Sequence, residues 1–257
     1  MTKQVNLNAD LGESHGIYSI GNDEAMLKTV NSANIACGYH AGDPIVMHGT
    51  IAEAKANGVS IGAHPSFPDL QGFGRRQMIF SSNELETMTA YQIGALSAMA
   101  AMNDTAVTHV KPHGAMNNMA SVDQDMADAI VRGMKAVDPN LILLATAGSC
   151  LYKAGLKYGI PTAGEIFADR TYDEAGNLAP RSQEGSVIHD VTQAADQVLS
   201  FLESGKILTP EGKGIDAEIH SICVHGDKPA ALAIATGVKE RLIKEGYQLT
   251  PLPLMFR

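Results

Sequence analysis

The sequence has 257 residues, of which 45% are hydrophobic and 18% charged, and its formal net charge is −9. This composition is ordinary for a globular protein, and α/β barrels of about 200–250 residues routinely form one domain. No linker-like segment interrupts the chain, so we expect residues 1–257 to form a single domain. The negative charge repels phosphate backbones and argues against a nucleic-acid partner.

The cysteines and the N-terminal segment predict the cellular compartment. Cys37, Cys150 and Cys223 are scattered and form no CxxC pair, which disfavours a disulfide framework and is typical of a reducing cytosol. The segment MTKQVNLNAD lacks the apolar core of a signal peptide. No apolar run approaches the ~18 residues that a membrane span needs. We expect a cytoplasmic protein without a membrane partner.

Seven short apolar runs, each followed by a turn or a helical pattern, predict β-strands. They cover residues 5–9, 32–36, 59–63, 106–110, 141–145, 161–167 and 219–224. Helix start signals follow several of these runs, at residues 43–44, 81–84, 121–124 and 227–229. Asn57-Gly58 ends the first of these helices, residue 102 ends the second, and Gly246 ends the last.

Alternating strands and helices predict parallel βα units, which either a closed barrel or an open doubly wound sheet would satisfy. The hydrophobic periodicity of the sequence is the same for a closed barrel and for an open sheet, so it does not distinguish them. Ionisable residues follow nearly every predicted strand, as expected where barrel strands deliver side chains to a common face. An open sheet would instead bind its ligand at one switch point fed by two or three strands. The distribution of polar residues therefore favours a barrel.

The first predicted strand has an unusual polar face. Alternation puts Asn6, Asn8 and Asp10 on one side of the strand and its apolar residues on the other. Buried amides need partners, because an unsatisfied one costs about 1–3 kcal/mol. A solvated edge strand is one explanation, and a wet barrel interior is the one we favour.

Histidines follow the second and third predicted strands. His40 lies between Gly38 and Gly42, which allow a tight bend, and His64 ends the third strand. A basic pair, Arg75-Arg76, comes in the next loop. One histidine alone is more often structural than functional, but recurrence at successive strand ends favours a shared site.

The fourth strand carries the densest signal. If it stays extended, His109, Lys111 and His113 share one face. Desolvation and like charge would then depress the pKa of Lys111, which suits proton transfer or polarisation of an amide. The alternative is a lysine paired with a carboxylate for structure alone. A catalytic lysine predicts that Lys111→Met folds but loses turnover, and a structural lysine predicts the reverse.

Acidic and basic residues also follow the sixth and seventh strands. Glu165 and Asp169 share a face and Arg170 comes next, while His225 and Asp227 follow the seventh strand. Asp227 is equally explained as a helix N-cap. The strand-end candidates together are Asp10, Glu13, His40, His64, Lys111, His113, Glu165, Asp169, Arg170 and His225. Such a set suits acid–base chemistry or a divalent metal.

Short motifs narrow the chemistry. Asp10, His40 and His64 could supply metal ligands, although no HExxH or Cys/His zinc spacing supports this. The absence of GxSxG disfavours a nucleophilic serine. The absence of a Walker motif means that ATP, if used, is not bound here by a P-loop.

Seven segments resemble, in order, the motif series of the LamB/YcsF family, the 5-oxoprolinase A subunits: NADLGE, NIACGYHAGDP, GAHPSFPD, FGRR, HVKPHGAMNN, EIFADRTY and CVHGDKP. They fall at every predicted strand end except the fifth. The resemblance implies a single irregular seven-stranded (β/α) barrel, similar to glycoside hydrolase/deacetylase barrels. One departure is HGAMNN, where the family usually reads HGALYN, so that Asn118 replaces an aromatic residue beside the site.

The resemblance also implies cleavage of 5-oxo-L-proline to L-glutamate, coupled to hydrolysis of ATP to ADP and phosphate. It implies separate B and C subunits as partners, and ATP, with Mg²⁺, held together with them. A bound divalent metal in the barrel is left open. The residues it carries over are Asp10, Glu13, His40, His64, Lys111, His113, Glu165, Asp169, Arg170, His225 and Asp227.

The chemistry of a lactam explains the need for ATP, because phosphorylating its oxygen would turn a stable amide into an activated imidate. On this hypothesis Asp10 or Glu165 activates water, and Lys111 or a histidine stabilises the oxyanion and protonates the nitrogen. Arg75, Arg170 and Asn8 are the expected substrate-binding residues. Two alternatives stay open: a metal-dependent carbohydrate deacetylase or amidase acting alone, and a non-enzymatic binding subunit.

Overall fold

The computed structural model describes residues 3–225 and 231–256. Seven parallel strands close into a barrel: β1 (Lys3–Leu11), β2 (Ser32–Ala36), β3 (Ser60–His64), β4 (Val107–Val110), β5 (Ile142–Thr146), β6 (Thr162–Phe167) and β9 (Ser221–Val224). The order is β1-β2-β3-β4-β5-β6-β9, and β9 pairs back onto β1. This closure confirms the barrel and excludes the open sheet. All seven strands lie within two residues of their predicted ends.

Strand β1 is buried from Val5 to Leu11. Its residues pair with β9 from Asn6 to Ala9 and with β2 from Asn8 to Leu11. Its first residues pair with an additional short strand, β10 (Tyr247–Leu249). The alternative of a solvated edge strand is therefore wrong, and the polar face of β1 points into the barrel.

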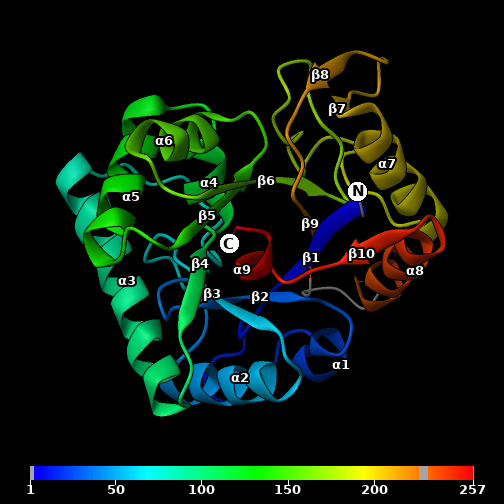
Figure 1. Cartoon of the computed structure of the whole chain (residues 1–257). Helices are drawn as coiled ribbons and strands as arrows, with labels where there is room; N and C mark the ends of the chain where they lie inside the picture. Colours follow the sequence, from blue (N-terminus) through cyan, green and yellow to red (C-terminus); the bar gives the residue numbers. More distant parts are fainter. Residues whose placement is uncertain (1–2, 226–230, 257) are drawn as a thin grey trace.

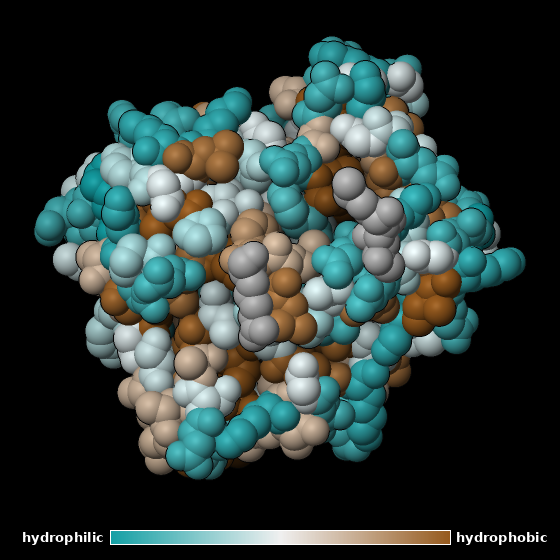
Figure 2. Space-filling model, viewed as in Figure 1, coloured by the Kyte–Doolittle hydropathy of each residue, from teal (hydrophilic) through white to brown (hydrophobic). Residues whose placement is uncertain are grey.

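Helices surround the ring of strands: α1 (Asp23–Leu27), α2 (Pro44–Ala56), α3 (Ser82–Met102), α4 (Gly114–Ala120), α5 (Gln124–Val137), α6 (Cys150–Tyr158), α7 (Val191–Ser204) and α8 (Ala231–Lys244). In Figure 1 a ninth helix, α9 (Leu252–Met255), lies in the middle of the ring. Leu252 packs there on Ile142, Leu144 and Ala163. Figure 2 shows hydrophobic surface near the centre of this face and mostly hydrophilic residues around the rim.

Capping side chains explain where the helices begin. Asp43 accepts hydrogen bonds from the backbone nitrogens of Ile45 and Val46, with Pro44 in the first turn, as predicted for α2. The predicted capping box of Ser81 and Glu84 is present at α3. Each such cap typically contributes about 1 kcal/mol.

The predicted start signal of α5, residues 121–124, does precede this helix, but the capping residue is Asp123 and not Ser121. Ser121 ends α4, and its hydroxyl donates to the carbonyl of Asn117. Asp123 is the N-cap of α5 and accepts from the backbone nitrogen of Met126 at 3.0 Å. The sequence patterns did not predict the short helix α4, because no capping side chain marks its start. The predicted start of α8, at 227–229, lies outside the described residues.

The sequence patterns also missed three short strands, β10 and the hairpin of β7 (Lys206–Leu208) with β8 (Gly214–Asp216). Each has only three residues, too few for a period-2 pattern to be distinguished. Among the described helices, none has the length and apolar character needed to cross a membrane.

Candidate active site

A hydrogen-bonded layer of buried side chains fills the barrel beneath the site. Asn6 donates to Ser32 at 2.9 Å and accepts from Ser221 at 2.7 Å. Two residues further along β1, Asn8 donates to Glu165 Oε1 at 2.9 Å and to Ser221 at 2.8 Å. Because every other residue of β1 points inward, these amides meet partners from β2, β6 and β9. The layer satisfies the polar face of β1 and holds the residues above it.

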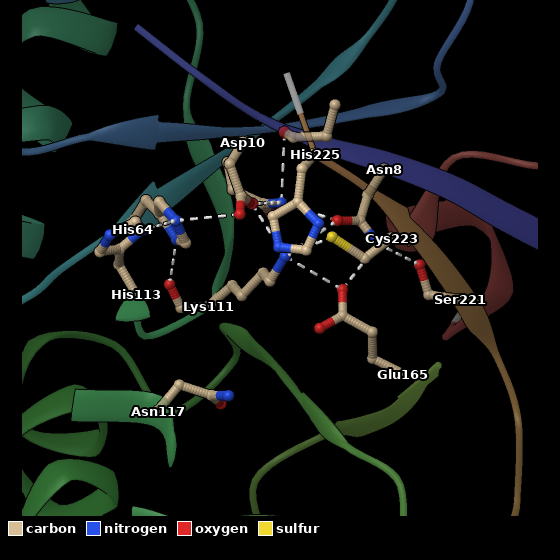
Figure 3. Close-up of polar contacts among 12 residues, drawn as sticks. Asn8, Asp10, His64, Lys111, His113, Asn117, Glu165, Ser221, Cys223 and His225 are labelled. Carbon is tan, nitrogen blue, oxygen red and sulfur yellow. Dashed lines mark hydrogen bonds and ion pairs between the residues drawn. The ribbon is translucent and has the colours of Figure 1, made fainter. Parts of the chain in front are cut away.

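Lys111 occupies the centre of the next layer, where β4 ends. Its Nζ atom lies 2.8 Å from Asp10 Oδ1, 3.3 Å from Glu165 Oε1 and 2.9 Å from Cys223 Sγ (Figure 3). The residue is 2% exposed. An ammonium group so deeply buried needs this many partners, since an unpaired buried charge costs several kcal/mol.

The predicted depression of the Lys111 pKa is wrong. Burial by itself lowers this pKa, but the charges of Asp10 and Glu165 outweigh it and hold the pKa well above its ordinary value. The neighbouring histidine is directed elsewhere: His109 Nε2 lies 3.1 Å from the side-chain oxygen of Asn34. Burial, followed by the charge of Lys111, lowers the pKa of His109 to about 3, so this ring is neutral. Lys111 is therefore a permanent cation.

The two carboxylates beside Lys111 differ in their basicity. Burial raises the pKa of Asp10, but His64 and Lys111 outweigh it and bring the pKa well below its ordinary value. For Glu165 burial prevails over Lys111, and its pKa is raised. Two nearby carboxyl groups with opposite shifts are a common arrangement where one must stay ionised and the other can carry a proton.

Three histidines and a glutamate form a second buried cluster beside Asp10. His64 Nε2 lies 3.4 Å from Asp10 Oδ2 and 2.9 Å from His113 Nδ1. The ring of His40 stacks on that of His113, with centroids 3.9 Å apart, and Glu13 Oε1 lies 3.5 Å from His40 Nε2. Burial is the main reason why the pKa values of His40 and His113 fall well below the ordinary value. These two imidazoles are neutral.

The loop after β3 covers this cluster closely. Gly74 has φ +64°, and a Cβ atom there would lie 2.8 Å from His40 Cβ and 2.9 Å from His113 Cδ2. Only glycine combines this backbone conformation with such a close approach. The FGRR segment thus brings the backbone of residues 73–75 onto the histidines.

A pocket of about 260 Å³ opens above these two layers. Asp10, His64 and Lys111 line it from within the barrel, and Phe167 and Leu178 give it an apolar side. The other lining residues are Arg75, Pro112, His113, Gly114, Ala115, Asn117, Asn118, Arg170, Arg181 and His225. A small pocket with an apolar side and a few charged groups is typical of a small-molecule site.

Two polar pairs shape the walls of the pocket. His225 Nδ1 lies 2.8 Å from Asp169, and its ring stacks on Phe167 with centroids 5.6 Å apart. The guanidinium of Arg170 donates to the carbonyls of Ala179 and Ser186, so it is fixed in place. Burial, followed by the charge of Arg181, lowers the pKa of Arg170 to about 10, and the residue remains a cation at neutral pH.

The structure brings the predicted site residues together in one region, but not all of them line the pocket. Those that do are Asp10, His64, Arg75, Lys111, His113, Arg170 and His225. Asn8, Glu13, His40, Glu165 and Asp169 lie behind this first layer and contact it. Asp227 lies outside the described residues.

Several residues that line or complete the site were not predicted, among them Asn117, Phe167, Leu178, Arg181 and Cys223. Cys223 could have been found, because strand alternation puts it on the same face as His225. Arg181 follows no predicted strand, so no pattern in the sequence singles it out. Asn118 does line the pocket, as the departure from the family motif implied.

Comparison with known proteins identifies the family. A model of the LamB/YcsF family matches residues 5–256. The chain belongs to the LamB/YcsF family. A LamB/YcsF relative, the A subunit of 5-oxoprolinase from Azoarcus sp. (strain BH72), is 50% identical over 252 residues, which cover 98% of each chain. A solved structure, the lactam utilization protein from Thermus thermophilus, is 40% identical, with a TM-score of 0.91 and coverage of 97% of this chain and 100% of that one.

A more distant likeness concerns the LamB/YcsF fold alone. The catalytic domain of a peptidoglycan N-acetylglucosamine deacetylase from Eubacterium rectale ATCC 33656 has a TM-score of 0.51 and 12% identity. The likeness covers 98% of this chain and 89% of the deacetylase domain. It agrees with the predicted relation to deacetylase barrels.

Proposed function

We propose that the chain is the A subunit of an ATP-dependent 5-oxoprolinase and that its pocket binds 5-oxo-L-proline for opening to L-glutamate. The names of the relatives support this reading. The observation that carries it is the pocket itself, which offers the Lys111 ammonium at its floor and three arginines on its walls. A small lactam with one carboxylate has a polar group for each end of such a pocket.

The charges suggest how the substrate lies. Arg170 and Arg181 are suited to bind the carboxylate, since guanidinium groups pair with carboxylates in bidentate fashion, and Arg75 adds positive charge nearby. The lactam oxygen then faces Lys111, which donates to the negative charge that develops there. Asn8 contributes indirectly, by holding Glu165 at 2.9 Å.

Two further groups have the properties needed for proton transfer. Asp10 stays ionised and is suited to accept a proton from the attacking water. His225, oriented by Asp169, is suited to donate a proton to the departing nitrogen, as in other sites where a carboxylate orients a catalytic histidine. Glu165, whose pKa is raised, can carry a proton beneath Lys111.

ATP, with Mg²⁺, is proposed to be held together with the B and C subunits. Transfer of its terminal phosphoryl group to the lactam oxygen activates the ring carbon, and water then adds to that carbon. The C–N bond breaks as the nitrogen takes up a proton, which leaves an acyl phosphate, and a second water hydrolyses this to glutamate and phosphate. Exposed isoleucines at the pocket end of the barrel support partner binding: Ile17, Ile45 and Ile79 are 92%, 82% and 96% exposed. Ile17 and Ile79 lie on loops and Ile45 in the first turn of α2, and exposed apolar groups gathered in this way often mark protein interfaces.

The test is a comparison of the chain alone with the chain co-purified with B and C subunits from a cytoplasmic expression host. Release of glutamate and of phosphate from 5-oxoproline is measured with and without ATP. We expect turnover only when all subunits and ATP are present. ATP-independent hydrolysis of acetylated sugars by the chain alone would instead support the deacetylase alternative. Ligand binding without any turnover in the assembly would support a binding subunit.

A further inference from the structure

His64 and His113 face each other, and each uses its outer ring nitrogen to contact a backbone carbonyl. His64 Nδ1 lies 2.6 Å from the carbonyl oxygen of Lys111, and His113 Nε2 lies 2.9 Å from that of Phe73. A carbonyl only accepts, so both of these nitrogens carry hydrogen. In a neutral imidazole the other nitrogen is then an acceptor. These two acceptors, His64 Nε2 and His113 Nδ1, are 2.9 Å apart, so a positive centre must lie between them or beside them.

Two more donor atoms converge on the same place. Glu13 Oε1 lies 3.6 Å from His113 Nδ1 and 3.5 Å from His40 Nε2. His40 is fully buried, and among the described residues neither of its ring nitrogens has a hydrogen-bond partner. A buried imidazole left in this way is costly, which indicates that a ligand completes its bonding. One ligand atom from each of Glu13, His40, His64 and His113 lies within 4.8 Å of the other three.

We propose that Glu13, His40, His64 and His113 bind one divalent ion of the Zn²⁺ class. Three imidazole nitrogens and one carboxylate oxygen are donors that Zn²⁺ prefers. Bonds of about 2.0–2.2 Å in a tetrahedral site put the donors roughly 3.3–3.6 Å from one another. Three of the six separations between these donors are 2.9, 3.5 and 3.6 Å, near that spacing, and all six are within 4.8 Å.

The surroundings of the cluster match those of metal-binding histidines. Such histidines usually donate their outer N–H to a carbonyl or carboxylate, which fixes the ring orientation. His64 and His113 both do so. The acceptor for His113 is Phe73, whose φ of +55° is unfavourable for an aromatic residue and costs roughly 1–3 kcal/mol. His40 must turn its ring out of the stack on His113 to bind, and it breaks no hydrogen bond with a described residue in doing so.

A second group of potential ligands, Asp10, Cys223 and His225, is a poorer site. The Lys111 ammonium already lies 2.8 Å from Asp10 Oδ1 and 2.9 Å from Cys223 Sγ, so a second cation there would be repelled. His225 Nδ1 is paired with Asp169 at 2.8 Å. The histidine cluster has no such ammonium group within it.

The proposed ion would border the pocket without filling it. His64 and His113 line the pocket, whereas Glu13 and His40 lie behind them. Bound there, the ion would supply positive charge and Lewis acidity next to Asp10, whose Oδ2 atom is 3.4 Å from His64 Nε2. Metal binding can be measured without 5-oxoproline, ATP or partner subunits, so this inference does not rest on the proposed function.

The experiment uses tag-free full-length chain, stripped with a chelator and then titrated with ZnCl₂ in a calorimeter. We expect one equivalent to bind, and Co²⁺ in its place to give the visible bands of a tetrahedral site. His40→Gln and His113→Gln should each weaken Zn²⁺ binding by about 100-fold or more, since even the loss of an outer-shell partner costs 10–100-fold. Two matched controls, His225→Gln and the exposed His48→Gln, should bind like the unaltered chain.

Several outcomes would overturn the proposal. Unaltered chain that binds no stoichiometric Zn²⁺ would mean that the two facing histidines share a proton instead. Loss of binding in His225→Gln, with retention in His40→Gln, would move the ion to the second group. Circular dichroism of each metal-free variant checks folding. If His113→Gln does not fold, His40→Gln carries the test, because its ring makes no hydrogen bond with a described residue.

Discussion

The ammonium of Lys111 lies 2.8 Å from the carboxylate of Asp10, although the two residues are 101 positions apart in the chain. Asp10 comes from β1 and Lys111 follows β4, so the pair spans the interior of the barrel. Glu165, from β6, lies 3.3 Å from the same ammonium on a third side. One cation therefore joins three walls of the barrel at the floor of the pocket, and it links stability to the proposed chemistry.

Replacing Lys111 with Met, which is close in volume, should reduce both stability and turnover. Without the ammonium, the buried carboxyl groups of Asp10 and Glu165 lose the cation they share, and breaking a buried ion pair typically costs about 3–5 kcal/mol. Loss of the proposed donor to the lactam oxygen should lower kcat by roughly 10²-fold or more. The free energy of unfolding in urea and the kcat of the assembled enzyme are measured on the same preparation. The structure thus replaces the simpler expectation that this variant folds normally.

A double variant separates the two effects. Lys111→Met combined with Asp10→Asn removes both charges of the closest pair, so it should recover part of the lost stability and none of the turnover. If the single variant has normal kcat per folded molecule, Lys111 has no catalytic role. If the double variant is no more stable than the single one, the buried charges are not the cause of the loss.

Arg181 provides a test of substrate binding. Replacing it with Gln should raise KM for 5-oxoproline about 10–100-fold with little change in kcat, because a hydrogen bond to a charged group contributes about 1.5–3 kcal/mol. Steady-state kinetics of the assembled enzyme give both constants. Lys153→Gln, which removes one positive charge from an exposed position on α6, is the matched control. An unchanged KM in the Arg181 variant would exclude a contact with the substrate.

Ile79 provides a test of partner binding. The side chain is 96% exposed on the loop after β3, at the pocket end of the barrel. Ile79→Glu should leave the melting temperature of the isolated chain nearly unchanged but reduce co-purification with the B and C subunits, because a charge cannot be buried cheaply in an apolar interface. Ile243→Glu is the control, since Ile243 is 56% exposed near the end of α8 that leads into β10. Equal loss of binding in both variants would contradict a specific interface at the pocket end.

The cysteines provide a test of the buried layer. Burial is the main cause that raises the pKa of Cys223 well above its ordinary value, and it raises the pKa of Cys37 to about 12. Both stay neutral thiols, and the thiolate is the reactive form. Iodoacetamide at about pH 8 should therefore modify only the half-buried Cys150 in the folded chain, and all three cysteines after unfolding. Peptide mass spectrometry locates the adducts, and an adduct on Cys223 in the folded chain would show that the floor of the barrel opens to solvent.

Much of the barrel follows from local patterns in the sequence. The seven strands were predicted because apolar runs alternate with helical stretches, and the polar face of β1 follows from the two-residue repeat of a strand. The start of α2 follows from Asp43 and Pro44, and that of α3 from Ser81 and Glu84, because a helix cap involves only residues three or four apart. The convergence of His40, His64 and Lys111 was predicted as well, since parallel barrel strands end on one face.

The charge state of the site was decided only by the tertiary structure. His109 and His113 are the near neighbours of Lys111 in the sequence, and they predict a depressed pKa. In the folded chain Asp10 and Glu165 face the ammonium instead, and the pKa is raised. The contact between His64 and His113, and the place of Arg181 on the pocket wall, likewise depend on how distant segments meet. Electrostatic energy depends on distance in space, so residues far apart in the chain determine it once the barrel has closed.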